Sequence, residues 1–171
     1  MYLDFILLIA DYFKTLNKKV VLYEWIIPFL ISFSLGLLFF FEGLPTVTDN
    51  FNNNVIRLLA VLVGFSITII IILTTGQSRN LEEIKKRKTE TVVNNKKVSL
   101  FKLLIINFTY AVVVEIMLIL TCLIYPFLLD KIEFSAIAKL VGFSTVLLLV
   151  IHILLLNVRN LTDFCLIITK E

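Results

Sequence analysis

The sequence predicts an all-α, polytopic membrane protein with four transmembrane helices. Of its 171 residues, 59% are hydrophobic and only 17% are charged, and the mean hydropathy is +0.98. Soluble domains contain about 45–50% apolar and about 25% charged residues, so this composition is typical of a chain whose solvent is lipid. Four long apolar segments lie at about residues 20–41, 56–75, 103–129 and 137–157. Each reaches the ~20 residues that a helix needs to cross a hydrocarbon core ~30 Å thick.

The spans occupy more than half of the chain, so no segment between them is long enough to bury a core of its own. We therefore expect a single membrane domain over residues 1–171 and no soluble catalytic domain. Lysine and arginine are distributed unevenly around the spans. Of the sixteen, only Arg57, Lys131 and Lys139 lie on the opposite side from both termini and the loop between spans two and three. Because positively charged loops stay in the cytoplasm, we expect a protein of the cell inner membrane with both termini cytoplasmic.

Residues 1–19 predict an amphipathic helix at the membrane interface. The segment lacks the basic start and the small-residue cleavage site of a signal peptide, and Asp4 and Asp11 lie two helical turns apart on one face. Lys14, Lys18 and Lys19 follow and would face lipid phosphates on the cytoplasmic surface.

The first span carries a stripe of four residues at four-residue spacing. These are Glu24, Pro28, Ser32 and Gly36. Ser32 and Gly36 form a small-residue pair that lets another helix approach closely, and Pro28 frees a carbonyl that a neighbouring helix or a water can satisfy. Glu24 is expected to reach water near the cytoplasmic boundary. Together with Gly64 in span two and Gly142 in span four, this stripe predicts packing seams for a homo-oligomer.

The connections between the spans differ in character. Residues 42–55 are rich in Asn, Gly and Pro and are expected to form a turn without a folded unit. Residues 76–102 form a basic cytoplasmic loop, in which we expect a short helix to about Thr91 and a turn at Asn94 and Asn95. Residues 158–171 would form a cytoplasmic tail. The loop offers basic contacts to a partner protein or to anionic lipid: Arg79, Lys85, Lys86, Arg87, Lys88, Lys96 and Lys97. Its position between two spans favours these over nucleic acid.

Polar residues within the spans are the candidates for function. A charge at the bilayer centre costs at least ~2.5 kcal/mol, so Glu115 in span three should face protein or a wet cavity. His152 in span four lies at a depth that differs from that of Glu115 by only ~5 Å at the helical rise per residue. Our hypothesis is that the two form a hydrogen-bonded or proton-sharing pair, with Asn107 as a further polar partner nearer the cytoplasm.

Three roles compete for this pair. It could hold helices together, it could line an ion or proton path in an oligomer, or His152 could ligate haem. The sequence has no HExxH motif, no GxSxG nucleophile elbow and no Gly-rich phosphate loop. We therefore expect no enzyme, no cofactor and no metal site. Cys122 lies within a span and Cys165 on the cytoplasmic side, so we expect no disulfide.

Residues 64–83 (GFSITIIIILTTGQSRNLEE) combine a span ending in small polar residues with a charged helix. This pattern resembles the small four-span bacterial membrane proteins encoded beside anti-phage defence genes, such as the membrane subunit of the Kiwa system. The resemblance implies an oligomeric inner-membrane sensor or effector that works with a cytoplasmic protein. An ion-conducting or proton-conducting oligomer, or a small transporter, is the alternative function, and a haem-binding membrane subunit is the second alternative.

Overall fold

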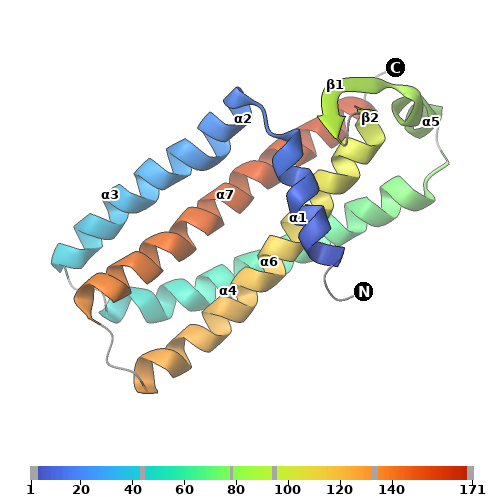
Figure 1. The fold of residues 1–171 in the computed structure, drawn as a ribbon. Coiled ribbons are helices and arrows are strands. Elements are labelled where there is room, and N and C mark those ends of the chain that lie inside the picture. Colours follow the sequence, from blue (N-terminus) through green and yellow to red (C-terminus); the bar gives the residue numbers. More distant parts are fainter. Residues whose placement is uncertain (1–3, 43–44, 78, 94–95, 132–134, 169–171) are drawn as a thin grey trace.

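Four long helices form an elongated bundle (Figure 1). This computed structural model describes residues 4–42, 45–77, 79–93, 96–131 and 135–168. The first long helix consists of α2 (Lys18–Val21), the π-helical turn η1 (Leu22–Ile26) and α3 (Ile27–Glu42); the others are α4 (Pro45–Thr75), α6 (Leu100–Lys131) and α7 (Ala136–Ile168). Each is long and apolar enough to cross a membrane. The expected four spans are confirmed, and the chain has the architecture of a multi-pass membrane protein.

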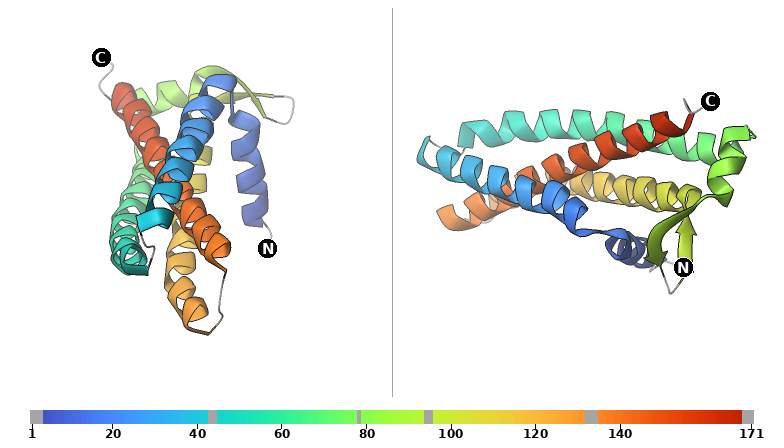
Figure 2. Two further views of the ribbon diagram at one scale, coloured as in Figure 1. Left: turned by 90° about the vertical axis from the view of Figure 1, so that its left-hand side faces the viewer. Right: turned by 90° about the horizontal axis from the view of Figure 1, so that it is seen from above.

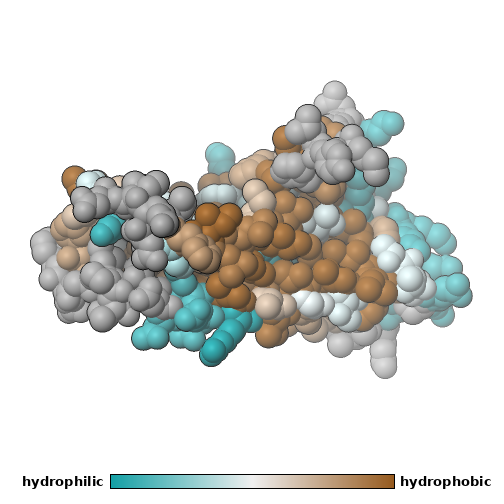
Figure 3. Space-filling model, turned by 90° about the horizontal axis from the view of Figure 1, so that it is seen from below, coloured by the Kyte–Doolittle hydropathy of each residue, from teal (hydrophilic) through white to brown (hydrophobic). Residues whose placement is uncertain are grey.

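The bundle is held together by three long packing interfaces. α4 and α7 both pack against α6, and α3 packs against α7. The interior is apolar around α6 and α7, with Leu118, Ile153 and Leu156 buried. Outward-facing residues are also apolar, for example Val61, Met117 and Val158. Figure 3 shows this as a broad hydrophobic surface over the middle of the molecule, with hydrophilic residues gathered at one end and along part of one edge. A helix that is apolar on all sides is the form expected in lipid.

Short elements gather near one end of the bundle. They are α1 (Asp4–Thr15), α5 (Arg79–Lys86), β1 (Lys88–Val93) and β2 (Lys96–Ser99). α1 lies across the bundle axis at a steep angle and packs against α6 and β1 (Figures 1 and 2). α5 buries Leu81 and Ile84 against α6, so its apolar stripe faces the bundle and its charges face outward. The N-terminal segment and the loop between α4 and α6 therefore form one continuous layer.

The expectation of a helix to about Thr91 is wrong. α5 ends at Lys86, and Lys88–Val93 pairs with Lys96–Ser99 as an antiparallel hairpin. The strand Lys88–Val93 is rich in threonine and valine, which favour extended backbone. The Thr89 hydroxyl donates to the Val98 carbonyl across the hairpin, and Val98 is buried. The expected turn at Asn94 and Asn95 lies outside the described residues.

Two other expected irregular segments are largely helical. α4 begins at Pro45, so most of the expected turn at residues 42–55 belongs to this helix. Proline is favoured in the first turn of a helix because the missing N–H would have no partner there. The expected tail from residue 158 continues α7 to Ile168, because Asn160 and Phe164 are buried against the bundle.

The stripe in the first span serves packing within the chain. Ser32 is 1% exposed, and a Cβ atom added at Gly36 would collide with the Ser144 hydroxyl of α7. A Cβ at Gly142 would make ordinary contact with Tyr125 at 3.5 Å. Around Gly64, no described atom lies within 4 Å of such a Cβ. The first two glycines thus lie at helix contacts inside the chain, whereas Gly64 remains on the surface, and self-assembly stays a prediction.

Candidate functional site

A buried ion pair joins the first and the last span. The Arg159 Nη1 atom of α7 lies 2.7 Å from Oε1 of Glu24 in η1, and Glu24 is only 3% exposed. The expectation that Glu24 reaches water is therefore wrong. A buried carboxylate needs a cation or several donors, because desolvation strongly disfavours an isolated charge. Arg159, two residues beyond the predicted end of span four, supplies that cation.

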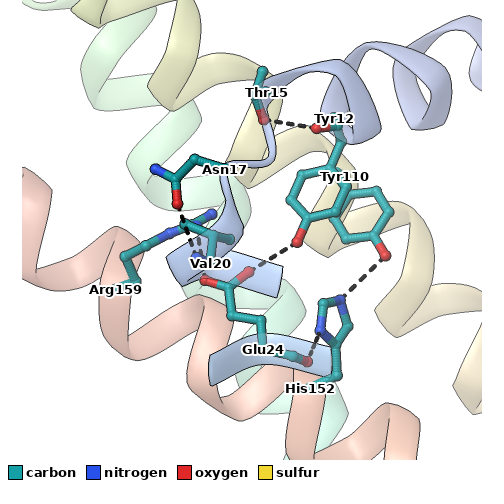
Figure 4. A network of polar contacts seen from close by, with 8 residues as sticks. All are labelled: Tyr12, Thr15, Asn17, Val20, Glu24, Tyr110, His152 and Arg159. Atoms are coloured by element: carbon teal, nitrogen blue, oxygen red, sulfur yellow. Dashed lines mark hydrogen bonds and ion pairs between the residues drawn. The ribbon is translucent and has the colours of Figure 1, made fainter. Parts of the chain in front are cut away.

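The backbone carbonyl of Glu24, within the π-helical turn, is freed by a proline four residues further on. Pro28 has no N–H, so the Glu24 carbonyl has no α-helical donor. His152 Nδ1 takes this place at 2.7 Å, as Figure 4 shows. This confirms the prediction that Pro28 frees a carbonyl for a neighbouring helix. Because a carbonyl oxygen only accepts hydrogen bonds, Nδ1 must carry a proton. Nε2 is hydrogen-bonded to the Tyr110 hydroxyl at 3.2 Å.

Tyr12 connects α1 to the same site. Its hydroxyl donates to Glu24 Oε2 at 2.8 Å, and its ring stacks on Tyr110 of α6 with centroids 3.6 Å apart and an angle of 3° between the planes. Tyr12 is fully buried although it lies outside the spans. Burial, and to a lesser degree the Glu24 carboxylate, raise the pKa of the Tyr12 hydroxyl well above its ordinary value of about 10. The hydroxyl therefore stays protonated and keeps donating.

These contacts form what we call the Glu24 network, which Figure 4 shows. It links four elements through five side chains, namely Tyr12, Glu24, Tyr110, His152 and Arg159. Both Glu24 oxygens are engaged, one by a phenol and one by a guanidinium. The network joins the helix that lies across the bundle to helices that span it, so a movement of α7 at Arg159 would change the contacts of α1.

A second polar group lies in the interior and comes from three helices. The Asn157 amide of α7 donates to Glu115 Oε1 of α6 at 2.8 Å, and the Ser66 hydroxyl of α4 donates to Asn157 Oδ1 at 3.2 Å. All three residues are at most 5% exposed. We call this set the Glu115 cluster. Glu115 is sheltered by neighbouring helices, as expected for a carboxylate within a span.

The predicted pair of Glu115 and His152 is wrong. Both side chains are 0% exposed, but both ring nitrogens of His152 are used in the Glu24 network and Glu115 bonds in its own cluster. Asn107 is also buried, yet within the described residues its Oδ1 has no partner. Similar depth in the membrane did not fix the partners, because the rotation of each helix about its own axis decides which side chains meet.

Several interior polar atoms lack a hydrogen-bond partner among the residues that the structure describes. Among them are Asn107 Oδ1, Glu115 Oε2 and both amide atoms of Asn160. Burying a polar atom without a hydrogen bond costs folding free energy. Such atoms are therefore ordinarily paired with a bound water or ion. The otherwise apolar interior beside α6 and α7 therefore contains polar atoms outside the two bonded groups.

The predicted basic contacts all lie on the surface of the loop layer. Arg79, Lys85, Lys86 and Arg87 belong to α5 and its end, and Lys88, Lys96 and Lys97 to the hairpin; all seven are exposed. Arg79 lies 3.9 Å from Glu83, and Lys85 lies over the Phe101 ring. These weak surface contacts leave the cations accessible to an acidic surface. We call these seven residues the basic face.

Chemical groups for a cofactor are scarce in the described part of the chain. It contains no cluster of three or more His, Cys, Asp or Glu side chains that could hold a metal ion. His152 could ligate haem iron only by giving up one of its two hydrogen bonds. Cys122 is buried and Cys165 is exposed.

Sequence reasoning missed the partners of Glu24. Arg159 is the first cation after span four and Glu24 lies early in span one, so opposite charges close to the same boundary could have indicated the pair. No periodic pattern indicates Tyr12 or Tyr110. Comparison of the chain with protein-family models, with curated proteins and with solved structures finds no match. The site must therefore be interpreted from its own chemistry.

Proposed function

We propose that this chain is a non-enzymatic sensor or effector of the inner membrane that signals through its basic face to a soluble partner. The observation that carries the proposal is the Glu24 network. It ties α1, which packs against the hairpin, to the spanning helices α6 and α7 through buried polar contacts. A change in the relative position of the spans would therefore alter the layer that carries the basic face.

The coupling between α1 and the spanning helices is strong because Glu24 is buried. A surface ion pair contributes little, but removing one partner of a buried pair leaves an uncompensated charge, which is strongly unfavourable. The network thus favours one arrangement of α1 against α7, and any stimulus that separates Arg159 from Glu24 would release α1. The loop charges and the even number of spans support a topology with this layer in the cytoplasm. The resemblance to defence-associated membrane proteins supports a role for an oligomer in anti-phage defence.

The test is recovery of a soluble protein through the basic face. Tagged protein is cross-linked in its native cells, and captured proteins are identified for the wild type and for a variant with Lys85, Lys86, Arg87 and Lys88 changed to Glu. Arg57→Glu/Lys139→Glu, which reverses two exposed charges near the other end of the bundle, is the control. The proposal expects a protein captured by the wild type and the control but lost from the loop variant. Equal capture by all three would contradict it.

Proton or ion conduction by an oligomer is the second candidate. Glu115 and the unpartnered amide atoms of Asn107 and Asn160 favour it, because they place exchangeable and polar groups inside the bundle. Conductance in planar bilayers that is lost in Glu115→Gln but kept in Glu24→Gln would favour this candidate. A wild-type protein without Glu115-dependent conductance would favour the sensor.

A further inference from the structure

A groove runs between the beginning of the first span and the second half of α7. Its volume is about 360 Å³. Lys19, Tyr23 and Ile27 line it from the first span, and Leu155, Val158 and Arg159 line it from α7. Glu24 lies at its base with the ion pair to Arg159. The groove is separate from the Glu115 cluster, which faces the bundle interior.

The groove changes character along its length. Lys19 is the second residue of the first candidate span, and Arg159 lies in the last quarter of the fourth, so the charged end is near the membrane boundary. Ile27 and Leu155 lie further along these spans, toward the middle of the membrane. Val158 is 62% exposed on the outer side of α7. A molecule in the groove would therefore meet cations at one end and aliphatic side chains at the other.

The charges at the polar end favour an anion. Lys19 and Arg159 line the groove together with a single carboxylate, Glu24. Glu24 engages Nη1 of Arg159, whereas Nε of Arg159 has no partner within the described residues. Asp163, one turn further along α7, interacts electrostatically with Arg159 but does not line the groove. Among the side chains that line the groove, one positive charge is thus in excess.

We propose that this groove preferentially binds one acidic phospholipid. Its phosphate contacts the Lys19 ammonium and the Arg159 guanidinium, and one acyl chain lies along Ile27, Leu155 and Val158. Phosphate oxygens are strong acceptors for both cations, and basic pockets between spanning helices are suited to acidic headgroups. The bound lipid would bridge the first span and α7 beside the ion pair. This inference does not depend on the proposed sensor function.

Native mass spectrometry of the purified protein tests the site. Phosphatidylglycerol is titrated against phosphatidylcholine, and the first is expected to bind with higher affinity. Lys19→Gln should reduce the ratio of the affinities for phosphatidylglycerol and phosphatidylcholine about fivefold, because one cation near the headgroups contributes about 1 kcal/mol. Lys18→Gln removes the same charge from the neighbouring residue, which does not line the groove, and should leave the preference unchanged.

A second pair of variants tests the apolar part. Val158→Trp should fill the groove and abolish the preference, whereas Ile137→Trp, at an equally exposed position elsewhere on α7, should not. Equal effects of Lys18→Gln and Lys19→Gln would overturn the proposal in favour of general surface attraction. Displacement of the lipid by millimolar inorganic phosphate, with no effect of Val158→Trp, would overturn it in favour of a simple anion site.

Discussion

Glu24 is the residue on which the architecture of this end of the bundle depends. Its carboxylate is paired with Arg159 and Tyr12, and its carbonyl accepts from His152. One residue therefore connects α1, the first span and α7 by its side chain and its backbone at once. Pro28 makes the backbone contact available, because it removes the competing helical N–H.

Removing only the cation of the Glu24–Arg159 pair should destabilise the protein more than removing both charges. Arg159→Gln leaves Glu24 buried without its guanidinium, and we expect a loss of about 3 kcal/mol in stability, the lower end for breaking a buried pair. Glu24→Gln/Arg159→Gln should regain a substantial part of this loss. Thermal unfolding in detergent measures both. Arg57→Gln, at an exposed position, is the control and should unfold like the wild type.

The Tyr12 hydroxyl should make stability depend on pH in the alkaline range. Burial raises its pKa above the ordinary value of about 10, so its contribution is complete below pH 10 and decreases as the pH rises further. Tyr12→Phe lacks this contribution at every pH. The difference in melting temperature between wild type and Tyr12→Phe should therefore shrink from pH 8 to pH 11. A difference that stays constant from pH 8 to pH 11 would contradict this, because it would show that folding does not shift the pKa of the Tyr12 hydroxyl.

At the scale of elements, the contact between α3 and α7 depends on Gly36. A side chain larger than hydrogen there meets Ser144 and Leu140 of α7. We expect Gly36→Leu to cost about 1–3 kcal/mol, as overpacking does in tightly packed cores. Gly64→Leu, where the described residues leave open space, is the matched control and should be tolerated in the monomer. Unfolding temperatures in detergent compare the two, and equal losses would argue against this packing.

The elements that the sequence predicts well are those whose pattern is dictated by lipid. Four apolar segments of sufficient length are enough to predict four spans, since a helix satisfies its own backbone hydrogen bonds in hydrocarbon. The hairpin Lys88–Val93 and Lys96–Ser99 was missed because its charges also suit a helix, and tertiary burial of Val98 decided the outcome. The extension of α7 to Ile168 was missed for the same reason, as Phe164 packs against α5 and α6.

At the scale of the whole molecule, the polar interior was predictable in composition but not in pairing. Glu115, His152 and Asn107 are buried as expected, but Glu115 bonds to Asn157 and His152 to Tyr110. Hydropathy indicates how deep a residue lies within a span. Its hydrogen-bond partners depend instead on the rotation of each helix about its own axis and on which helices pack against each other. Neither follows from the sequence of a single chain.

The charge distribution makes a prediction about the topology of the chain. Both termini and the loop between α4 and α6 should lie in the cytoplasm. A fluorescent protein fused to the C-terminus should therefore fluoresce, and alkaline phosphatase at the same position should be inactive. Alkaline phosphatase placed in the connection between α6 and α7 should be active. The opposite pattern would place the basic face outside the cytoplasm and remove the proposed partner contact.

The central claim is that a buried network fastens α1 to the spanning helices, and hydrogen exchange of α1 in lipid nanodiscs tests it most directly. Tyr12→Phe removes one hydrogen bond to Glu24 and keeps the aromatic ring. A hydrogen bond to a charged acceptor contributes about 1.5–3 kcal/mol. Because its loss makes local opening of α1 easier, the amides of α1 should exchange at least tenfold faster. Tyr23→Phe, at an exposed ring, should leave them unchanged. Equal exchange of α1 in the wild type and in Tyr12→Phe would contradict the account.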